Sequence, residues 1–320
     1  MLDDTIPPLL VTSQASVVGM DRQLRRRVDA GELHRLRAGV FVDATVWNAL
    51  DFDARFRVAV HGASRKLMVG TQFSHASAVA LWHLPGIGAW PNRVDVLVAH
   101  ATGGRSSRAV SRHIGPLDPL ASTIHSAMVT SLPRTVIDSA RTTDFLRAVV
   151  VADAALATPP EGSFRHLNGI GPISRVDLDQ LLAHWSPTDP GIARARRVLA
   201  FADGRSGSPG ESISRVQCHL AGFPPPELQV PFSDERGFIG YADFYWPELD
   251  LIGEFDGDVK YRSETFRRGR LPEHVVLDEK RREDRLRRVV RGFERWDWAV
   301  ARNQRQLVAR LAPHGLIAVR

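Results

Sequence analysis

The sequence predicts a multidomain α/β protein, because segments with strand periodicity alternate with segments of helical periodicity along the chain. Residues 93–99 include a short apolar run typical of a buried strand, whereas residues 271–290 repeat with helical spacing. Two stretches rich in Pro, Gly and Ser, at 158–175 and 204–210, are typical of breaks between domains. We therefore expect three domains, at residues 1–46, 47–203 and 204–320.

The composition is that of an ordinary globular protein, with 43% hydrophobic and 8% aromatic residues among 320. No apolar run approaches the roughly 20 residues that a membrane span needs. The chain begins Met1-Leu2-Asp3-Asp4, which is unlike a signal peptide. A single cysteine, Cys218, excludes an internal disulfide framework and a cysteine-based zinc site. We expect a cytoplasmic protein that does not contact membranes.

The first 46 residues have the pattern of a winged helix-turn-helix. We expect a helix over 9–19, a second helix over Arg22–Ala30 capped by Asp21, and a two-stranded ribbon over 32–42 that turns near Ala38-Gly39. The second helix would enter the major groove of double-stranded DNA, and the ribbon would approach phosphate or the minor groove. A solvated helix face and a protein-binding winged helix are the alternatives. The residues predicted to bind DNA are Arg22, Arg25, Arg26, Arg27, Arg35 and Arg37.

The middle of the chain predicts an α/β domain without a recognisable catalytic site. Helices are expected over 51–67, 73–84, from Pro133, over 149–156 and within 176–201, and a strand over 93–99. His75 and Asp138 are the polar residues that we considered for function, and hydrogen bonding within the packed domain is the favoured role for both. No triad and no metal-ligand spacing occurs here, so this domain is expected to position the winged helix or to bind a partner.

The C-terminal segment carries the strongest chemical signal. After a helix opened by Glu211 and a strand over 228–232, two strands over 239–246 and 249–256 are expected to form a hairpin around Trp246-Pro247-Glu248. In that hairpin, Asp243 would lie opposite Ile252 and diagonal to Glu254, at about 7–8 Å. Asp243, Glu254 and Asp256 would then share one pocket.

Carboxylates at this spacing repel one another unless a cation lies between them, and a hard divalent ion with oxygen ligands, Mg²⁺ or Mn²⁺, is expected. Lys260 would steady a phosphate or the attacking water. An acidic loop beside a strand is the alternative.

A basic helix over 271–290 follows the acidic residues. From Lys260 to Arg291 the chain has twelve Lys or Arg against six Asp or Glu, a surplus that equals the +6 of the whole chain. Cations beside a carboxylate pocket suit a protein that holds a phosphodiester, and Lys280 and Arg282 are predicted to contact nucleic acid. A solvated helix face is the alternative. We expect a last strand over 296–302.

These residues resemble the PD-(D/E)XK nuclease superfamily, in the branch related to very-short-patch-repair endonucleases. The resemblance covers roughly residues 205–310 and is carried by Asp243, by Glu254-Phe-Asp256-Gly, by Lys260-Tyr and by the charged helix with Glu279-Lys280. It implies a restriction-endonuclease-like α/β domain in which Asp243 and Glu254 hold the metal with Asp256 beside them. It also implies a supporting metal role for Glu211, although Glu in a first helical turn equally complements the helix dipole. Asp256 stands where the superfamily motif has Lys.

Residues 9–160 resemble the AbiEi-like antitoxins of type IV toxin–antitoxin systems. The matching segments include Gly31-Glu-Leu33-His-Arg35, Gly39-Val40-Phe41 and Ser74-His75-Ala76-Ser77. The resemblance implies a winged-helix DNA-binding region and a nucleotidyltransferase-type toxin as a partner.

Taken together, the sequence favours a DNA-binding protein with a metal-dependent endonuclease domain that hydrolyses phosphodiester bonds. In this mechanism Asp243, Glu254, Asp256 and Lys260 would be catalytic, and the metal would be held by Asp243, Glu254, Asp256 and Glu211. The alternative is a non-catalytic, antitoxin-like transcriptional repressor whose C-terminal fold serves as a basic binding platform.

Overall fold

The computed structural model of the protein describes residues 6–12, 20–99, 107, 109–157, 173–257 and 272–318, with backbone only at 20, 21 and 272–276. The chain divides into two compact units. The C-terminal unit contains the described residues of Ala152–Glu161 and Phe201–Arg320, and the N-terminal unit those of Leu2–Val151 and Gly162–Ala200. The predicted separation of residues 1–46 from 47–203 stays a prediction. No helix in the described ranges has the length and apolar character to cross a bilayer.

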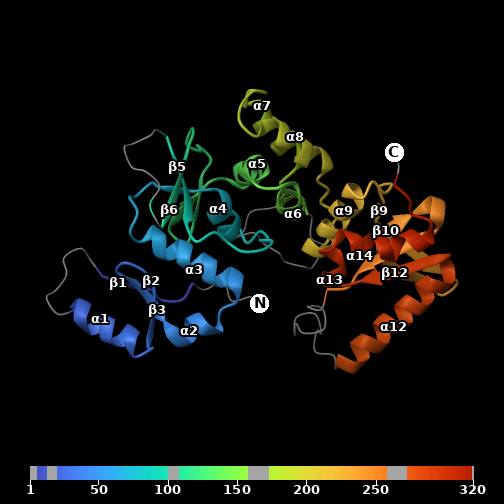
Figure 1. Cartoon of the computed structure of the whole chain (residues 1–320), viewed down its shortest axis with the longest axis horizontal. Coiled ribbons are helices and arrows are strands. Elements are labelled where there is room, and N and C mark those ends of the chain that lie inside the picture. The colour runs from blue at the N-terminus through green and yellow to red at the C-terminus, as the bar shows by residue number, and fades with distance from the viewer. Residues whose placement is uncertain are drawn as a thin grey trace. The chain divides into compact units, whose positions relative to one another are not determined.

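The described residues form three sheets with helices around them, which confirms the mixed α/β class (Figure 1). The first sheet, in the order β1-β3-β2, is built from β1 (Leu10–Val11), β2 (Leu33–Arg37) and β3 (Val40–Asp43). The helices around it are α1 (Met20–Asp29), α2 (Ala44–Ala49) and α3 (Phe52–Ser64). The predicted basic helix and ribbon are therefore present as α1 and as β2 with β3.

The helix expected over 9–19 is wrong at its start, because Leu10 and Val11 form a strand. The N–H of Thr12 donates to Gly39 O at 2.9 Å, and β1 pairs antiparallel with β3. Pairing with the free edge of β3 satisfies backbone groups that a lone helical turn after Pro7-Pro8 would leave open. Residues 13–19 lie outside the described residues.

The second sheet of the N-terminal unit has the order β6-β5-β4-β8-β7. Its strands are β4 (Gln72–Phe73), β5 (Val94–Val98), β6 (Val110–Ile114), β7 (Ser122–Ile124) and β8 (Ala127–Val129). The helices that follow or interrupt them are α4 (His75–Leu81), α5 (Leu132–Thr142), α6 (Phe145–Leu156), α7 (Arg175–Ala183) and α8 (Ile192–Phe201). The buried strand predicted over 93–99 is confirmed as β5. The helix expected from Phe73 begins only at His75, since Gln72 and Phe73 pair with β5 and β8.

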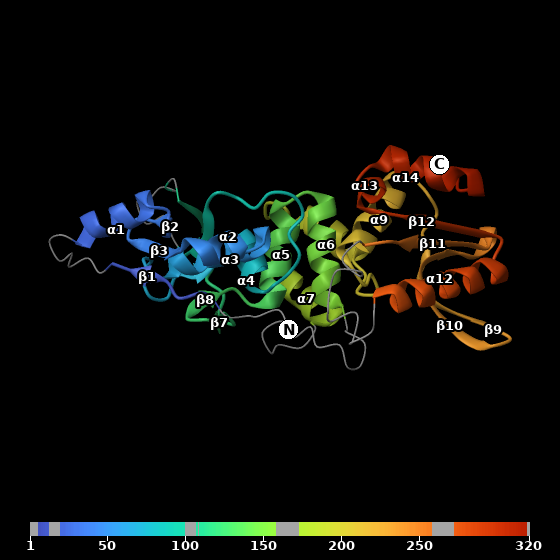
Figure 2. The ribbon, with the colours of Figure 1, turned by 90° about the horizontal axis from the view of Figure 1, so that it is seen from below.

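The C-terminal unit is a four-stranded sheet in the order β12-β11-β10-β9. Its elements are α9 (Pro209–Leu220), β9 (Glu227–Asp234), β10 (Gly237–Trp246), the 3-10 turn η1 (Pro247–Leu249), β11 (Leu251–Phe255), α12 (Pro272–Val289), β12 (Gly292–Trp296), α13 (Trp298–Ala301), α14 (Gln304–Leu311) and η2 (Ala312–His314). In Figure 2, α13 and α14 lie beyond β12 on the side away from α12, and α12 contacts β9, β10 and β12.

The strand predicted over 296–302 is wrong in register. The strand is β12, which ends at Trp296 and runs parallel to β11. Asp297 then caps α13, because its side chain accepts the N–H of Val300 at 3.0 Å. This cap turns the chain into a helix where the aromatic pattern of the sequence favoured a strand.

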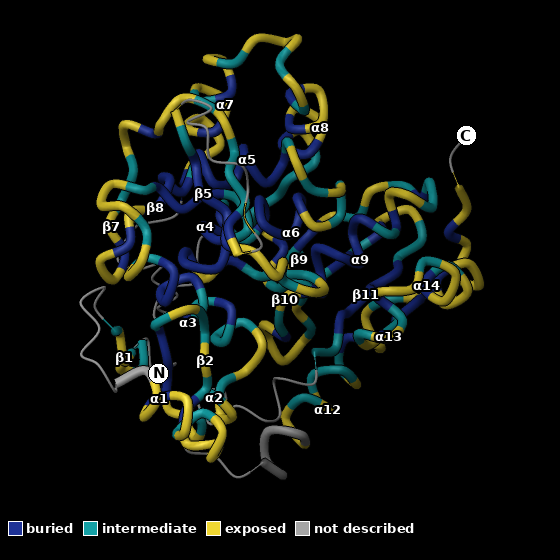
Figure 3. The backbone as a smooth tube through the Cα atoms, turned by 60° about the vertical axis from the view of Figure 1, so that its left-hand side comes forward, coloured by how far each residue is buried: buried dark blue, intermediate teal, exposed yellow. Residues whose placement is uncertain are grey.

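Aromatic packing fixes β11 in the middle of the sheet. Phe244 stacks on Trp296 with ring centroids 5.5 Å apart. Gly253 lies against the same indole: a Cβ atom there would approach Trp296 to 2.6 Å. Figure 3 shows β11 and α9 as largely buried backbone. Glycine at position 253 therefore lets the rings of Trp296 and Trp246 pack directly against β11, next to Glu254.

A buried ion pair joins the end of α6 to α9 within the C-terminal unit. Nη2 of Arg215 donates to both carboxylate oxygens of Asp153, at 2.8 and 2.7 Å, and Nη1 donates to Phe201 O at 2.7 Å. The two side chains are 8% and 1% exposed. Burial raises the pKa of Asp153, although Arg215 acts against that rise. The carboxylate therefore depends on its arginine partner.

We expect Arg215→Met to destabilise the protein by about 3–5 kcal/mol, because Asp153 would remain buried without a countercharge. Urea unfolding of the whole chain measures this change. The matched control is Arg205→Ala, which removes the exposed Arg205–Asp203 pair and should cost no more than about 1 kcal/mol. Equal urea midpoints for Arg215→Met and the wild type would show that the Arg215–Asp153 ion pair does not stabilise the fold.

Candidate functional site

The turn between β10 and β11 brings Asp243 and Glu254 to neighbouring positions. Phe244 pairs with Gly253 and Tyr245 with Ile252, so Asp243 comes opposite Glu254. The predicted hairpin is confirmed, but its predicted register, with Asp243 opposite Ile252, is wrong by two residues. The η1 turn and the left-handed backbone of Asp250, at φ 47°, set the actual register. The two carboxylates are thus closer in the ladder than the sequence predicted.

Asp243 is held by the backbone of β11 and by a glutamine of β9. The N–H of Phe255 donates to Oδ2 of Asp243 at 2.9 Å, and Nε2 of Gln229 donates to Oδ1 at 3.2 Å. Gln229 has a left-handed backbone, at φ 53°, which is uncommon for a residue with a side chain. Gln229 could not be recognised from the sequence, because neither its residue type nor its spacing marks a glutamine that links two acids.

Glu211 meets the same glutamine from the first turn of α9. Its Oε2 accepts Nε2 of Gln229 at 3.1 Å and the N–H of Gly207 at 2.8 Å. Its Oε1 accepts the hydroxyl of Ser208, which in turn caps the helix. Gln229 therefore connects Glu211 with Asp243, while Glu211 also serves the helix N-terminus as the dipole interpretation expected.

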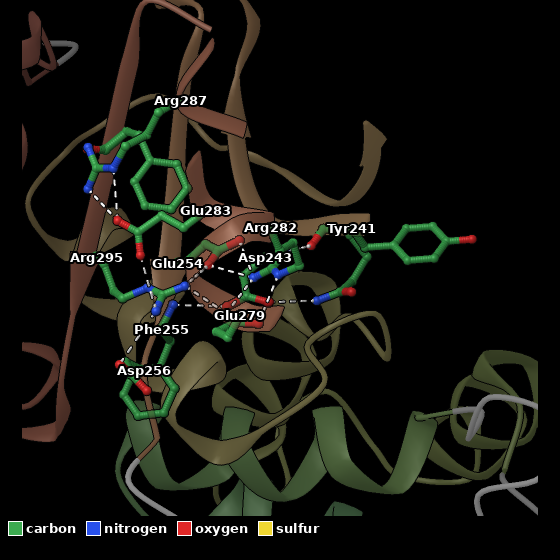
Figure 4. A network of polar contacts seen from close by, with 12 residues as sticks. Tyr241, Asp243, Glu254, Phe255, Asp256, Glu279, Arg282, Glu283, Arg287 and Arg295 are labelled. Atoms are coloured by element: carbon green, nitrogen blue, oxygen red, sulfur yellow. Dashed lines mark hydrogen bonds and ion pairs between the residues drawn. The ribbon is translucent and has the colours of Figure 1, made fainter. Parts of the chain in front are cut away.

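Glu254 is bound by arginines from two elements. Its side chain is 5% exposed, and Nη2 of Arg282 on α12 lies 2.8 Å from each of its oxygens. Nη2 of Arg295 on β12 donates to Oε2 at 2.7 Å. Figure 4 shows both guanidinium groups directed at this carboxylate. The negative charge of Glu254 is therefore already neutralised inside the protein.

Glu279 binds the same two arginines. Its Oε1 accepts Nη2 of Arg282 at 3.0 Å and Nη2 of Arg295 at 2.8 Å, and its Oε2 accepts Nε of Arg282 at 3.1 Å. Burial lowers the pKa of Arg282, but its bonds to Glu279 and Glu254 outweigh burial and raise that pKa overall. Burial likewise raises the pKa of Glu279, and its bonds to Arg282 and Arg295 lower it overall.

Two further acids lie at the border of this network. Nη1 of Arg295 is 3.8 Å from Oδ2 of Asp256 and 3.3 Å from Oε2 of Glu283. The N–H of Asp256 donates to Trp296 O at 2.8 Å. Asp256 is thus placed beside Arg295. Lys260 lies outside the described residues.

The carboxylate of Glu254, as it is bound here, does not fit as a ligand of a Mg²⁺ or Mn²⁺ ion. Among the described residues, no three His, Cys, Asp or Glu side chains gather as a metal-binding group. Both oxygens of Glu254 already accept hydrogen bonds from guanidinium nitrogens. A divalent ion would have to displace an arginine to reach them.

The arginines predicted to bind nucleic acid fall into two groups. Arg22, Arg25, Arg26 and Arg35 are exposed, as is Lys280. Arg27 pairs with Glu32 at 2.9 Å, and Arg37 is half-buried, which lowers its pKa. Arg282 is directed inward to Glu254 and Glu279. Of the residues predicted to bind nucleic acid, the exposed arginines therefore lie on α1 and β2, and the exposed residue on α12 is Lys280.

Comparison with known proteins gives distant homology and no family. The chain is 29% identical over 224 residues to the uncharacterized protein Rv2248 of Mycobacterium tuberculosis, covering 66% of this chain and 72% of that protein. The uncharacterized protein MT2308 of the same species matches to the same extent. No family model matches the chain. The crystal structure of the RV2827C protein from Mycobacterium tuberculosis is similar at a TM-score of 0.34 and 14% identity, covering 61% of this chain and 68% of that one.

The contact between β9 and α12 predicts a dependence of stability on pH. Hydrogen bonds from Arg285 lower the pKa of Asp234 to about 2 from an ordinary value of 3.8. A depressed carboxyl pKa stabilises the fold above the ordinary value, and this contribution is lost as the pH falls toward about 2. We expect Asp234→Asn to melt below the wild type at neutral pH and to approach it near pH 2. Thermal unfolding at both pH values measures the difference.

Asp284→Asn is the control for this prediction, because Asp284 is exposed on α12, the helix that carries Arg285. It should follow the wild type at both pH values. A gap between Asp234→Asn and the wild type that stayed constant with pH would show that Asp234 does not contribute through its charge.

Proposed function

We propose that the protein binds double-stranded DNA through the exposed basic face of α1 and β2. The observation that supports this proposal is the position of Arg22, Arg25 and Arg26. They lie exposed on a helix whose opposite side carries the buried Leu24, and within the described residues no ion pair occupies them. Spacings of three and four residues put these arginines on one helix face.

The anchoring of α1 explains why this face is turned to solvent. Leu24 is 8% exposed and forms a core cluster with Leu33 and Phe41, against which Val28 packs. The helix is therefore fixed to the ribbon by its apolar side. A fixed helix presenting several cations is suited to phosphate, because each neutralised phosphate releases condensed counterions.

Most cations of α12 are less suited to this role. Arg281, Arg282, Arg285 and Arg287 each form an ion pair, with Asp278, Glu254, Asp234 and Glu283 respectively. Arg282 and Arg285 are turned toward the sheet, whereas Arg281 and Arg287 form their pairs at the surface and Arg288 is exposed as well. We therefore assign the principal DNA contact to α1 and β2, where Arg35 is also exposed, and a smaller contribution to Lys280.

In this proposal residues 1–46 are a winged helix-turn-helix and the protein is a non-catalytic regulator of the antitoxin-like type. The arginine-bound state of Glu254 supports a regulator over an enzyme. The resemblance of residues 9–160 to AbiEi-like antitoxins adds a nucleotidyltransferase-type toxin as the proposed partner.

Replacing Arg22, Arg25 and Arg26 together by Gln should weaken binding to duplex DNA strongly at low salt. Each lost phosphate contact removes ~0.9 from the slope of log K against log salt, so the slope should fall by about 3. Fluorescence anisotropy across a salt series measures both changes.

The control variant Arg93→Gln/Arg196→Gln/Arg305→Gln removes the same charge from exposed positions elsewhere in the chain. This variant should keep most of its affinity for duplex DNA and nearly the same slope of log K against log salt as the wild type. Equal losses in the two triple variants would mean that only net charge matters, and the assignment to α1 would be abandoned.

Metal-dependent phosphodiester hydrolysis by a nuclease-like C-terminal domain is a second candidate. One observation favours it: Asp243 lies opposite Glu254 and shares Gln229 with Glu211, so three of the predicted metal ligands come from adjoining positions. A metal held by Glu254 would first have to displace Arg282 and Arg295 from its oxygens.

If the second candidate is correct, wild-type protein with Mg²⁺ or Mn²⁺ nicks supercoiled DNA and Asp243→Ala does not. Agarose electrophoresis of plasmid substrates measures this. Asp284→Asn should cleave like the wild type. Intact plasmid at every metal concentration, or equal cleavage by Asp243→Ala, would leave DNA binding as the sole function.

A further inference from the structure

Two carboxylates of the C-terminal unit converge on shared positive centres. Nη2 of Arg282 lies 2.8 Å from both oxygens of Glu254 and 3.0 Å from Oε1 of Glu279. Nη2 of Arg295 lies 2.7 Å from Oε2 of Glu254 and 2.8 Å from Oε1 of Glu279. Each nitrogen therefore bridges the same two acids, which come from β11 and α12.

We infer that Glu254 and Glu279 form a cation site that the protein fills with its own guanidinium groups. Glu279 was not among the predicted metal ligands, and the structure pairs it with Glu254 where the sequence favoured Asp243 as the partner. The inference does not depend on the proposed binding of DNA by α1.

The spacing of the oxygens fits nitrogen better than a divalent metal. Mg²⁺ requires oxygen ligands at about 2.0–2.1 Å in an octahedron. The distances to the bridging nitrogens are 2.7 to 3.0 Å, those of charge-assisted hydrogen bonds. Holding Mg²⁺ between the same oxygens would require the two carboxylates to move closer together and both arginines to leave.

The arginines are themselves fixed in this position. Arg282 also donates from Nη1 to Tyr241 O at 3.4 Å, and Nη1 of Arg295 faces Glu283 and Asp256. The Nε–H of Arg295 is buried and meets no acceptor among the described residues. The Nη groups, directed at the acids, therefore orient this side chain.

The sign of one stability change tests the inference. In an empty metal site the carboxylates repel one another, so replacing one of them in metal-free buffer relieves this repulsion and raises Tm. Where arginines fill the site, the same replacement leaves a buried guanidinium short of its countercharge and lowers Tm. We expect Glu254→Gln to lower Tm in buffer containing EDTA and Mg²⁺ to leave the wild-type Tm unchanged. A rise in Tm for Glu254→Gln would overturn the inference.

The second test is Mn²⁺ binding. It is measured as the decrease of the EPR signal of free Mn²⁺ when protein is added. We expect Glu254→Gln to bind as much Mn²⁺ as the wild type, because Glu254 holds no metal in the wild type. Arg282→Met/Arg295→Met, if folded by circular dichroism, should bind Mn²⁺, and adding Glu254→Gln and Glu279→Gln should remove that binding. Arg287→Met is the control, because Arg287 pairs with Glu283 and does not contact Glu254.

A wild-type protein whose bound Mn²⁺ disappears in Glu254→Gln would falsify the inference, even if the double arginine variant does not fold. DNA binding is measured separately with the α1 variant. Failure of one proposal is therefore distinguishable from failure of the other.

Discussion

The C-terminal unit depends on the neutralisation of one buried carboxylate. Glu254 sits in the middle of a sheet, 4% exposed, where an unpaired charge would cost several kcal/mol. Arg282 reaches it from α12 and Arg295 from β12, so the helix and the parallel strand are both tied to β11. The covering helix is thereby held against the sheet by charge as well as by Leu286, which packs with Ile252 and Phe293.

The same constraint separates two uses of basic residues in one chain. Arginines near buried acids form ion pairs inside the domain. The exposed arginines of α1 face solvent, because the opposite side of this helix packs its apolar residues against the ribbon. The net charge of +6 therefore says little about where a polyanion would bind. The pairing of each arginine says more, because a paired guanidinium has few donors left for phosphate.

Much of the local structure could be predicted from periodicity and capping signals. The buried strand β5, the hairpin of β10 and β11, and helices α1, α9 and α12 lie close to the predicted ranges. The errors occur where tertiary contacts override local pattern: Leu10–Val11 joins β3 as a strand, and Asp297 caps a helix after Trp296. Gln229 had no distinguishing spacing, and Glu279, although part of the motif on the charged helix, gave no sign that it shares its arginines with Glu254.

The sequence by itself determined that Asp243 and Glu254 would lie on adjacent strands, because alternation and the Pro247 turn require a hairpin. It also determined that the arginines of α1 share a face, since helical spacing dictates this. Only the tertiary structure decided what neutralises the acids. Arg295 is forty-one residues from Glu254 and meets it through parallel pairing of β12 with β11, a contact that no local pattern encodes.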